Sequence, residues 1–418
     1  MGSTEDRALA AMRELLRSHL AGPSDLPRMV EAAGSLLGAT LSRLYLADYD
    51  QVLLVPLTVS ATGEPDVPAV DDPGPIPIDG TLAGLAFSGI AQHVTTPDGG
   101  PVTRWTPVLD CTERLGVLEL ELPEDEAADD DVREAVLDVA ALVAEMVITR
   151  SLYGDAVEHA RRTSHHSEEA ELQWRQLPPL TFVSPELSVA GVVAPAHEVA
   201  GDSFDYAING SVAHVAVLDG MGHGLEATLL AAVAVSWMRK SRFEGLDLEA
   251  TVRAVDAGVA AHFGADKFLT GIIGELDVAT GWWRWVTCGH PPALLLRGGK
   301  VVKQLDAVVG APLGLELLGD GPLMGQEHLE PGDRLVLYTD GVVEARDETG
   351  AFFGTDRLVE FVTREAAHAR PVAETLRRLN HAVLRHQDGE LQDDATTVVV
   401  EWRTGPTLVD MSEPTVEG

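Results

Sequence analysis

Four acidic positions beside a glycine or a second aspartate are the residues of this chain best suited to catalysis. Each adjoins an apolar, strand-like run, and they are Asp202 in VAGDSFDY, Asp219 in VAVLDGMGHG, Asp340 in LVLYTDGVVEA and the pair Asp393 and Asp394 in LQDDATTVVVEW. A strand that ends in this way places a carboxylate at the rim of a sheet, and glycine lets another group approach the backbone. Mg²⁺ and Mn²⁺ prefer oxygen ligands, so several such rims that meet predict a metal site.

One such position alone would not justify this prediction. Asp-Gly is the commonest turn dipeptide, and any single instance is better explained as a plain turn. Four such acidic positions in one region, each beside an apolar run, favour the metal site instead.

Short β-rich runs from Leu187 to Trp402 carry these residues, with two long helical stretches at about 224–240 and 247–263. Pro178 and Pro179 end the preceding helix, because proline does not continue a helix interior. We place the domain boundary there, which gives a catalytic domain over 177–404 and a polar tail over 405–418.

The sequence blocks of this half follow a recognisable order. They are LQWRQLPP, PAHEVAGDSFDY, VAVLDGMGHGLEATLLAA, FLTGIIGELDVATG, TCGHPPALLLR, GAPLGL, LEPGDRLVLYTDGVVEARD and DDATTVVVEW. Together, over residues 175–402, they resemble the catalytic domain of the protein phosphatase 2C (PPM) superfamily. The resemblance is to the bacterial branch that contains the stage II sporulation (SpoIIE) phosphatase and the stress-response phosphatases of sigma-factor pathways.

The resemblance implies two bound ions, Mn²⁺ or Mg²⁺. Asp219 would bridge them and Gly220 would offer its carbonyl to one. Asp202 would bind the second ion directly or through water, and Asp340 and Asp393 would complete the first site. These four aspartates are therefore also the expected catalytic set.

Other acidic and histidine residues near these motifs have open roles. Asp393 is favoured over Asp394 because the family's matching pair places its ligand first. Glu344 is a candidate for a third ion or a solvated helix residue. Asp205 is a candidate for tuning the second site or for capping a turn, and His223 for proton transfer or hydrogen bonding.

The implied mechanism is hydrolysis by an activated water. Two ions about 3.5–4 Å apart lower the pKa of a bridging water, which attacks phosphorus in line, while the protein supplies position and charge. A Cys or Ser nucleophile is not needed, in agreement with the absence of a Cys-x5-Arg phosphate loop from the sequence.

Three departures from the family pattern are visible. Ala200 replaces the first glycine of a Gly-Gly-Asp motif, and Thr287 and Cys288 replace Asn-Ala before Gly289 and His290. His290 is expected to be structural, with a general-acid role as the alternative. No equivalent is evident for the phosphate-binding arginine of the larger eukaryotic members.

The N-terminal half is predicted to be a regulatory α/β module. After a helix within 1–24, residues 25–131 resemble a GAF domain: strands at 41–47 and 51–57, a helix at 80–94 and a closing strand at 115–123. A ligand-binding sensor and a purely dimerising domain both remain open, and Cys111 is expected to be an ordinary buried thiol.

A helical segment over 132–176 is expected to join the two domains. Its apolar positions follow a 4-3 rhythm that suits a paired helix, and they are Val132, Val136, Val139, Val143 and Met146. This predicts a homodimer through the linker, whose movement would pass a signal to the catalytic domain.

The composition of the chain limits the classes of partner that it is expected to bind. The net charge of −36 argues against nucleic acid, because phosphate backbones need lysine and arginine for neutralisation. No apolar run approaches the ~20 residues that span a bilayer, and the two cysteines lack metal spacing. A cytoplasmic protein without a membrane partner is expected.

The predicted fold is α/β: a GAF-like domain, a helical linker and a phosphatase β-sandwich flanked by helices. The predicted function is metal-dependent hydrolysis of phosphoserine or phosphothreonine on a signalling protein, with an anti-sigma-factor antagonist as the substrate that the resemblance implies. The alternatives are a non-catalytic scaffold of the same fold and a small-molecule phosphatase.

Overall fold

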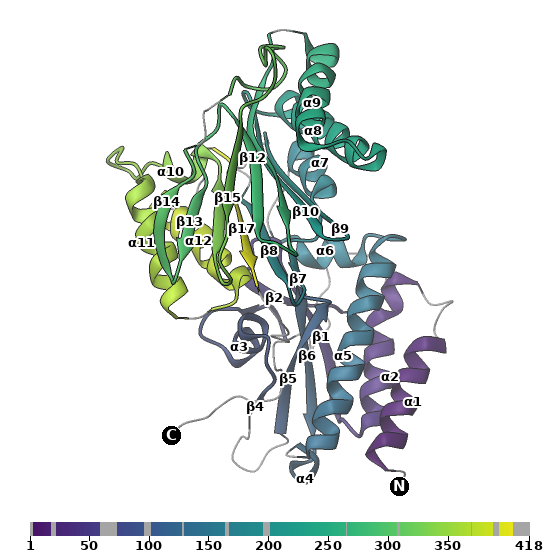
Figure 1. The fold of residues 1–418 in the computed structure, drawn as a ribbon. Helices are drawn as coiled ribbons and strands as arrows, with labels where there is room; N and C mark the ends of the chain where they lie inside the picture. The colour runs from purple at the N-terminus through teal and green to yellow at the C-terminus, as the bar shows by residue number, and fades with distance from the viewer. Residues whose placement is uncertain are drawn as a thin grey trace. The chain divides into compact units, whose positions relative to one another are not determined.

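The chain forms two compact units, residues 1–165 and 166–408, in a computed structural model (Figure 1). The structure describes residues 3–17, 22–58, 73–95, 102–127, 129–163, 167–194, 201–264, 266–306, 310–368, 370–387 and 393–403. The predicted polar tail and Ala200 lie outside these ranges. None of the described helices is long and apolar enough to cross a membrane.

The first unit is built on a six-stranded antiparallel sheet in the order β3–β2–β1–β6–β5–β4. Its strands are β1 (Leu41–Ala47), β2 (Leu53–Pro56), β3 (Ile76–Pro77), β4 (His93–Thr95), β5 (Val102–Asp110) and β6 (Glu113–Leu122). Apolar side chains alternate along β1, because successive residues of a strand point to opposite faces. Leu44 and Leu46 enter the larger core of this unit, whereas Tyr45 and Ala47 enter a smaller one.

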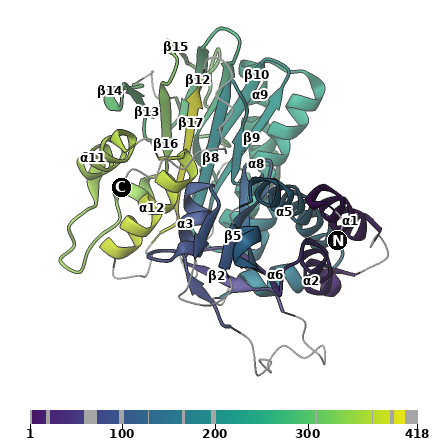
Figure 2. The ribbon, with the colours of Figure 1, turned by 90° about the horizontal axis from the view of Figure 1, so that it is seen from below.

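Helices cover both faces of this sheet. Three of them, α1 (Thr4–Arg17), α2 (Leu26–Leu37) and α5 (Asp130–Ser151), pack together over the larger core (Figure 2). On the other face, α3 (Leu82–Gly89) packs against β4, β5 and β6. The short helices η1 (Pro23–Asp25), α4 (Glu124–Ala127) and α6 (Ala156–Arg161) complete the unit.

The predicted linker helix differs from the observed structure. Helix α5 ends at Ser151, and α7 (Glu168–Gln176), capped by the Ser167 hydroxyl, belongs to the second unit. The 4-3 residues are buried in the core of their own unit, each no more than 7% exposed: Val132, Val136, Val139, Val143 and Met146. Their use as a seam between two subunits is therefore ruled out, because they already pack against α1, α2 and the sheet.

A second expectation for this unit was also wrong. Cys111 is exposed, not buried, and its backbone has a φ of +52° in the turn between β5 and β6. The turn places the side chain outside the sheet, although the flanking strands are apolar.

The second unit contains two antiparallel sheets, ordered β15–β12–β11–β10–β9 and β14–β13–β16–β17–β8–β7. Their strands are β7 (Thr181–Val183), β8 (Leu187–Ala194), β9 (Asp202–Asn209), β10 (Val212–Gly220), β11 (Leu269–Asp277), β12 (Trp282–Cys288), β13 (Leu294–Arg297), β14 (Lys300–Gln304), β15 (Met324–His328), β16 (Arg334–Tyr338) and β17 (Ala395–Trp402). Residues of both sheets, such as Val217 of β10 and Val398 of β17, share one core.

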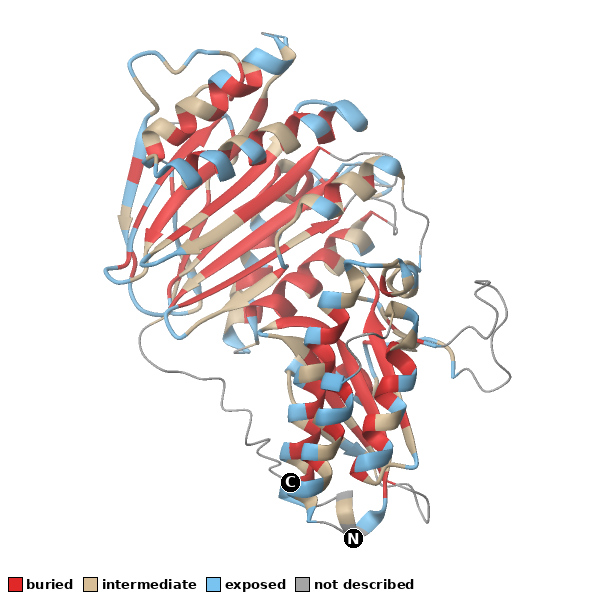
Figure 3. Ribbon diagram, turned by 90° about the vertical axis from the view of Figure 1, so that its right-hand side faces the viewer, coloured by how far each residue is buried: buried red, intermediate tan, exposed pale blue. Residues whose placement is uncertain are grey.

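Helices flank this sandwich, as predicted. On the side of β10 and β11, α8 (Leu225–Glu244) and α9 (Leu248–Phe263) enclose a second core, close to the helices expected at 224–240 and 247–263. On the side of β8, β16 and β17, α11 (Gly354–Ala367) and α12 (Val372–His386) enclose a third. The strands between these helix layers are largely buried (Figure 3). The α/β fold class is confirmed.

Candidate active site

Asp202 and Asp219 meet on neighbouring strands. Asp202 is the first residue of β9 and Asp219 the last but one of β10, and the antiparallel register places them directly opposite each other. Phe204 and Val217, each two residues away, lie in the core between the two sheets. Because side chains alternate along a strand, both carboxylates lie on this inner face, at the ends of their strands.

Asp340 and Asp393 come from the other sheet. Strand β16 ends at Tyr338, and Asp340 begins the single-turn helix α10 (Asp340–Val343). Asp393 directly precedes Asp394 and the start of β17, the neighbour of β16. Gly341 is needed here, because a β-carbon at this position would lie 1.9 Å from the carbonyl oxygen of Asp394.

Three of the predicted carboxylates line one pocket of about 420 Å³. The residues around it are Asp219, Met221, Gly222, His223, Phe268, Thr270, Asp340 and Asp393. No lysine or arginine is among these described lining residues. The pocket therefore concentrates negative charge, and its polar side-chain groups are three carboxylates, the Thr270 hydroxyl and the His223 imidazole.

Asp202 and Asp394 lie behind this pocket and are held by hydrogen bonds. The Thr339 hydroxyl donates to Oδ2 of Asp202 at 2.7 Å. Oδ2 of Asp394 accepts from the backbone N–H groups of Gly201 at 2.8 Å and Asp202 at 3.3 Å, and from Nε2 of Gln173 at 3.2 Å. Asp394 is thus buried and joins neighbouring segments through its hydrogen bonds, whereas Asp393 faces the pocket.

Burial and mutual repulsion raise the pKa values of these acids. Burial, followed by the charges of Asp340 and Asp393, raises the pKa of Asp219 to about 7. Burial and the charges of Asp219 and Asp394 raise the pKa of Asp202 well above its usual range. Burial also raises the pKa of Asp393, to which Asp340 and Glu344 contribute. A like charge disfavours ionisation, so the site as a whole favours a bound cation.

The donor chemistry fits a hard divalent cation. Carboxylate oxygens are the ligands that Mg²⁺ and Mn²⁺ prefer, and Mg²⁺ usually keeps several waters. Among the residues that the structure describes, no three His, Cys, Asp or Glu side chains gather closely enough to form a complete metal site. Asp219, Asp340 and Asp393 line one pocket without forming such a group, so they would hold an ion only if their side chains moved closer together and water filled the remaining positions.

Two further predicted residues adjoin the pocket. His223 is exposed and lines it, and its charge lowers the pKa of Asp393. Gly220 donates its N–H to the Gly201 carbonyl at 2.9 Å, and a β-carbon at Gly220 would lie 2.8 Å from the Ala227 carbonyl. The backbone at Gly220 therefore depends on having no side chain.

The other candidates lie outside the pocket lining. Glu344 is exposed at the end of α10. Asp205 is buried on the opposite face of β9, where it accepts from Arg239 at 2.8 Å and Arg242 at 2.6 Å, both on α8. His290 is 3% exposed, and its Nδ1 lies 2.8 Å from the Thr270 hydroxyl.

Sequence reasoning did not single out Thr270, Thr339 or Gln173. Thr270 is in FLTGIIG, Thr339 in LYTDG and Gln173 in LQWRQLPP, so all three occur in the blocks that carried the resemblance. The signal that was available was the position of each threonine: Thr339 directly precedes Asp340, and Thr270 ends an apolar run next to glycine.

Comparison with known proteins agrees with this geometry. The sequence profile of Stage II sporulation protein E (SpoIIE) matches residues 209–403. This part of the chain is similar to the SpoIIE family. The SpoIIE-type segment includes Asp219, Asp340 and Asp393, the three carboxylates of the pocket.

Individual relatives match at low identity. Protein IcfG of Synechocystis sp. is 24% identical over 243 residues, which cover 51% of this chain and 38% of IcfG. The phosphoserine phosphatase RsbU of Bacillus subtilis is 25% identical over 217 residues, 51% of this chain and 63% of RsbU. The chain thus spans less than two thirds of either relative.

A solved structure of the RsbU and RsbW domains of a Mycobacterium tuberculosis protein is 27% identical, with a TM-score of 0.47, over 54% of this chain and 63% of that one. The similarity to a GAF domain over residues 25–131 stays a prediction.

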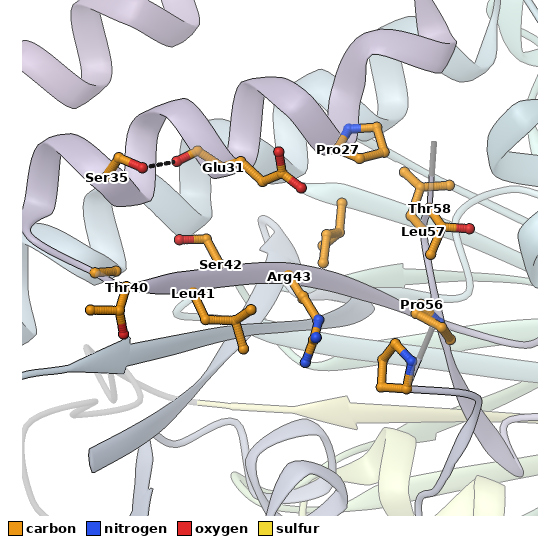
Figure 4. Close-up of a pocket in the computed structure, with 13 residues that line it drawn as sticks. Pro27, Glu31, Ser35, Thr40, Leu41, Ser42, Arg43, Pro56, Leu57 and Thr58 are labelled. Carbon is orange, nitrogen blue, oxygen red and sulfur yellow. Dashed lines mark hydrogen bonds between the residues drawn. The ribbon is translucent and has the colours of Figure 1, made fainter. Parts of the chain in front are cut away.

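The first unit has a separate pocket of about 490 Å³ between α2 and the first half of β1. Figure 4 shows Glu31 and Ser35 on α2 on the side toward which Ser42 of β1 points, whereas the Arg43 side chain extends from β1 away from α2. The pocket combines charged, hydroxyl and apolar groups. Its lining does not include Cys111.

Proposed function

We propose that this chain is a divalent-metal-dependent phosphatase that hydrolyses phosphoserine or phosphothreonine on a signalling protein. The observation that carries the proposal is that Asp219, Asp340 and Asp393 line one pocket, with Asp202 directly opposite Asp219 on the neighbouring strand. The match of residues 209–403 to the SpoIIE family supports it. The named activity of RsbU, a phosphoserine phosphatase, supports the same class of substrate.

In this mechanism the chain supplies the carboxylates that would hold the metal ions. Two Mn²⁺ or Mg²⁺ ions, when bound, would supply an activated water and would neutralise the phosphoryl oxygens. Asp219 would hold both ions and Asp340 and Asp393 would hold one, while Thr339 keeps Asp202 in place for the second. Glu344 remains a candidate for a third ion. His223, exposed at the pocket, is the residue we assign to protonating the leaving group.

The rim of the pocket favours a protein over a metabolite as substrate. Met221 lines the pocket and is 39% exposed, and Leu225 and Leu229 follow at helical spacing with 50% and 41% exposure. Leu225 and Leu229 are four residues apart on α8 and share one face, so they form an apolar stripe on its first turns, and Met221 lies in the turn that precedes this helix. A small phosphorylated metabolite would leave this stripe in water, whereas a folded protein that presents a phosphoserine would cover it. An anti-sigma-factor antagonist is the substrate that the family resemblance suggests.

The test is hydrolysis of p-nitrophenyl phosphate and of a phosphoserine protein, with Mn²⁺, with EDTA, and with Asp219→Ala. Turnover that requires Mn²⁺ and disappears in Asp219→Ala supports the phosphatase. A folded chain that binds Mn²⁺ but hydrolyses neither substrate would instead be a non-catalytic scaffold. Preference for free metabolites over every phosphoprotein would support the small-molecule alternative.

A further inference from the structure

The outer side of α5 in the first unit carries a second pocket, of about 730 Å³. Helix α1, which packs beside α5 (Figure 2), contributes Met12 and Leu16 to its lining. Helix α5 contributes Leu137, Ala141 and Leu142. The turn between β5 and β6 contributes Cys111 at the edge. The pocket is therefore apolar at its centre and open at the surface of this unit.

Both helices leave a face without a covering layer here. On α5, Asp138, Ala141 and Glu145 are exposed at intervals of three and four residues, so they share one side of the helix. This side is opposite to the one that is buried in the core of the unit. On α1, Leu9 is 42% exposed and Leu16 is 64% exposed. An apolar surface of this kind beside a pocket indicates an interaction site.

The same surface carries charges of both signs on separate helices. Arg13 and Arg17 of α1 are exposed, and neither side chain has an ion pair or hydrogen bond within the described residues. The carboxylates of Asp138 and Glu145 on α5 likewise lack one in this part of the chain. The surface thus has unpaired cations on α1 and unpaired anions on α5, on either side of exposed apolar groups.

This pattern of charge fits a second copy of the same chain. Two copies with a net charge of −36 repel each other over most of their surface, so a contact between them needs a face with matched charges of both signs. A two-fold axis brings the same patch of both copies together, so a patch with cations on one helix and anions on its neighbour can match itself twice.

We propose that this face joins two copies of the chain about a two-fold axis, with α1 of each copy packed against α5 of the other. Leu9 and Leu16 of one copy cover the pocket beside Ala141 of the other, whose short side chain allows a close approach. Arg13 and Arg17 pair with the carboxylates of the second copy's α5. The contact uses the exposed side of α5, not its buried 4-3 residues, and it does not depend on the proposed function.

The first experiment is sedimentation velocity on the full chain over a wide range of concentration, combined with maleimide labelling of Cys111. The chain has two cysteines, and the other one, Cys288, is buried, so labelling reports on the edge of the pocket. We expect a dimer to form as the concentration rises, and labelling of Cys111 to slow in parallel. A monomer at every concentration would overturn the proposal. A monomer whose Cys111 is nevertheless protected would overturn it too, because another segment of the same chain would then cover the face.

Charge reversal tests the pairing between copies. Arg13→Glu with Arg17→Glu makes both helices acidic, and Asp138→Lys with Glu145→Lys makes both basic. Each variant alone should associate about 100-fold more weakly or worse, because like charges then meet at both contacts. An equal mixture of the two should form a mixed dimer, since opposite charges then meet at both. An effect confined to α1 and α5 of one chain would not be repaired by mixing, so a mixture that stays monomeric would overturn the proposal.

A variant at the centre of the face keeps the test independent of the charges. Ala141→Arg places a long cation on the exposed side of α5 and should leave the chain monomeric, with thermal unfolding showing that the variant is folded. Leu85→Arg is the matched control, because Leu85 is 53% exposed on α3, over the opposite face of the sheet. A folded Ala141→Arg that remains dimeric, or an equal loss of dimer in Leu85→Arg, would refute contact at this face.

Discussion

Asp202 and Asp219 face each other across β9 and β10, and neither forms an ion pair with a lysine or arginine in the part of the chain that the structure describes. Like charges directly opposite on neighbouring strands destabilise a sheet. Asp205, only three residues from Asp202, has two arginine partners, so the chain does supply cations to a buried carboxylate elsewhere on the same strand. The negative charges of Asp202 and Asp219 therefore reduce the stability of the metal-free protein at the site that we propose binds the metal.

Replacing Asp219 should therefore have opposite effects on activity and on stability. Asp219→Asn removes a proposed ligand, and we expect Mn²⁺-dependent hydrolysis to fall by more than the roughly 10- to 100-fold cost of losing an outer hydrogen-bond partner. It also removes a repelling charge, so the metal-free protein should unfold at a temperature several degrees higher, about 2–4 °C per kcal/mol. Kinetics and calorimetry on the same sample measure both. A variant that is less stable and equally active would contradict this account.

The pKa of Asp219 predicts how metal binding depends on pH. This pKa is about 7 in the folded protein against 3.8 for an unperturbed aspartate, so below pH 7 the ion must displace a proton. We expect Mn²⁺ affinity to rise about tenfold from pH 6 to pH 8 and then to level off. The raised pKa also means that the metal-free protein loses stability as the pH rises through this range, since the folded state holds the proton more tightly than the unfolded state. Titrations at pH 6, 7 and 8 test this, and a flat affinity would refute it.

The sequence alone was sufficient to predict the acidic residues at the strand ends and the strands that carry them. Asp219 and Asp340 end apolar runs with Asp-Gly, a pattern that depends only on local chain chemistry, and the structure brings both to one pocket. The choice between Asp393 and Asp394 came from the family pattern alone. Two adjacent residues at the start of a strand have side chains on different sides. Only the folded structure shows that Asp394 is the one that faces inward to Gln173 and Gly201.

Other features could not be predicted from the sequence, because they depend on which distant part of the chain packs against a given segment. The 4-3 rhythm from Val132 to Met146 shows that one face of a helix is apolar, and such a face is compatible with a partner helix or with the core of its own domain. Here the core of the first unit covers it. Likewise, Thr339 is an ordinary residue by propensity, and its hydrogen bond to Asp202 appears only when distant parts of the chain are brought together.

Gln173 links the helix that enters the second unit to the acidic site. Its Nε2 donates to the Asp202 carbonyl at 2.8 Å and to Asp394 at 3.2 Å, although Asp394 is 221 residues away in the sequence. Gln173→Ala removes a buried donor from both, so we expect unfolding to become easier by ~1–3 kcal/mol and Mn²⁺ affinity to fall. Gln176→Ala is the matched control, because among the described residues that side chain donates only to the Leu172 carbonyl of its own helix. Equal behaviour of the two variants in unfolding and titration would show that Gln173 does not support the site.

The apolar stripe beside the pocket should affect protein substrates alone. Leu225→Ser with Leu229→Ser removes two exposed side chains that a docked phosphoprotein would bury, and we expect its KM to rise roughly 5- to 30-fold, as a loss of about 1–2 kcal/mol implies. Hydrolysis of p-nitrophenyl phosphate should change less than about twofold, because this small molecule does not reach the stripe. Phe243→Ser is the control, since Phe243 is 93% exposed at the far end of the same helix and should leave both substrates unaffected. Equal loss with both substrates would mean that the serines disturb the pocket itself, and equal loss in Phe243→Ser would mean that any exposed apolar residue of α8 matters, so either result would refute docking at this rim.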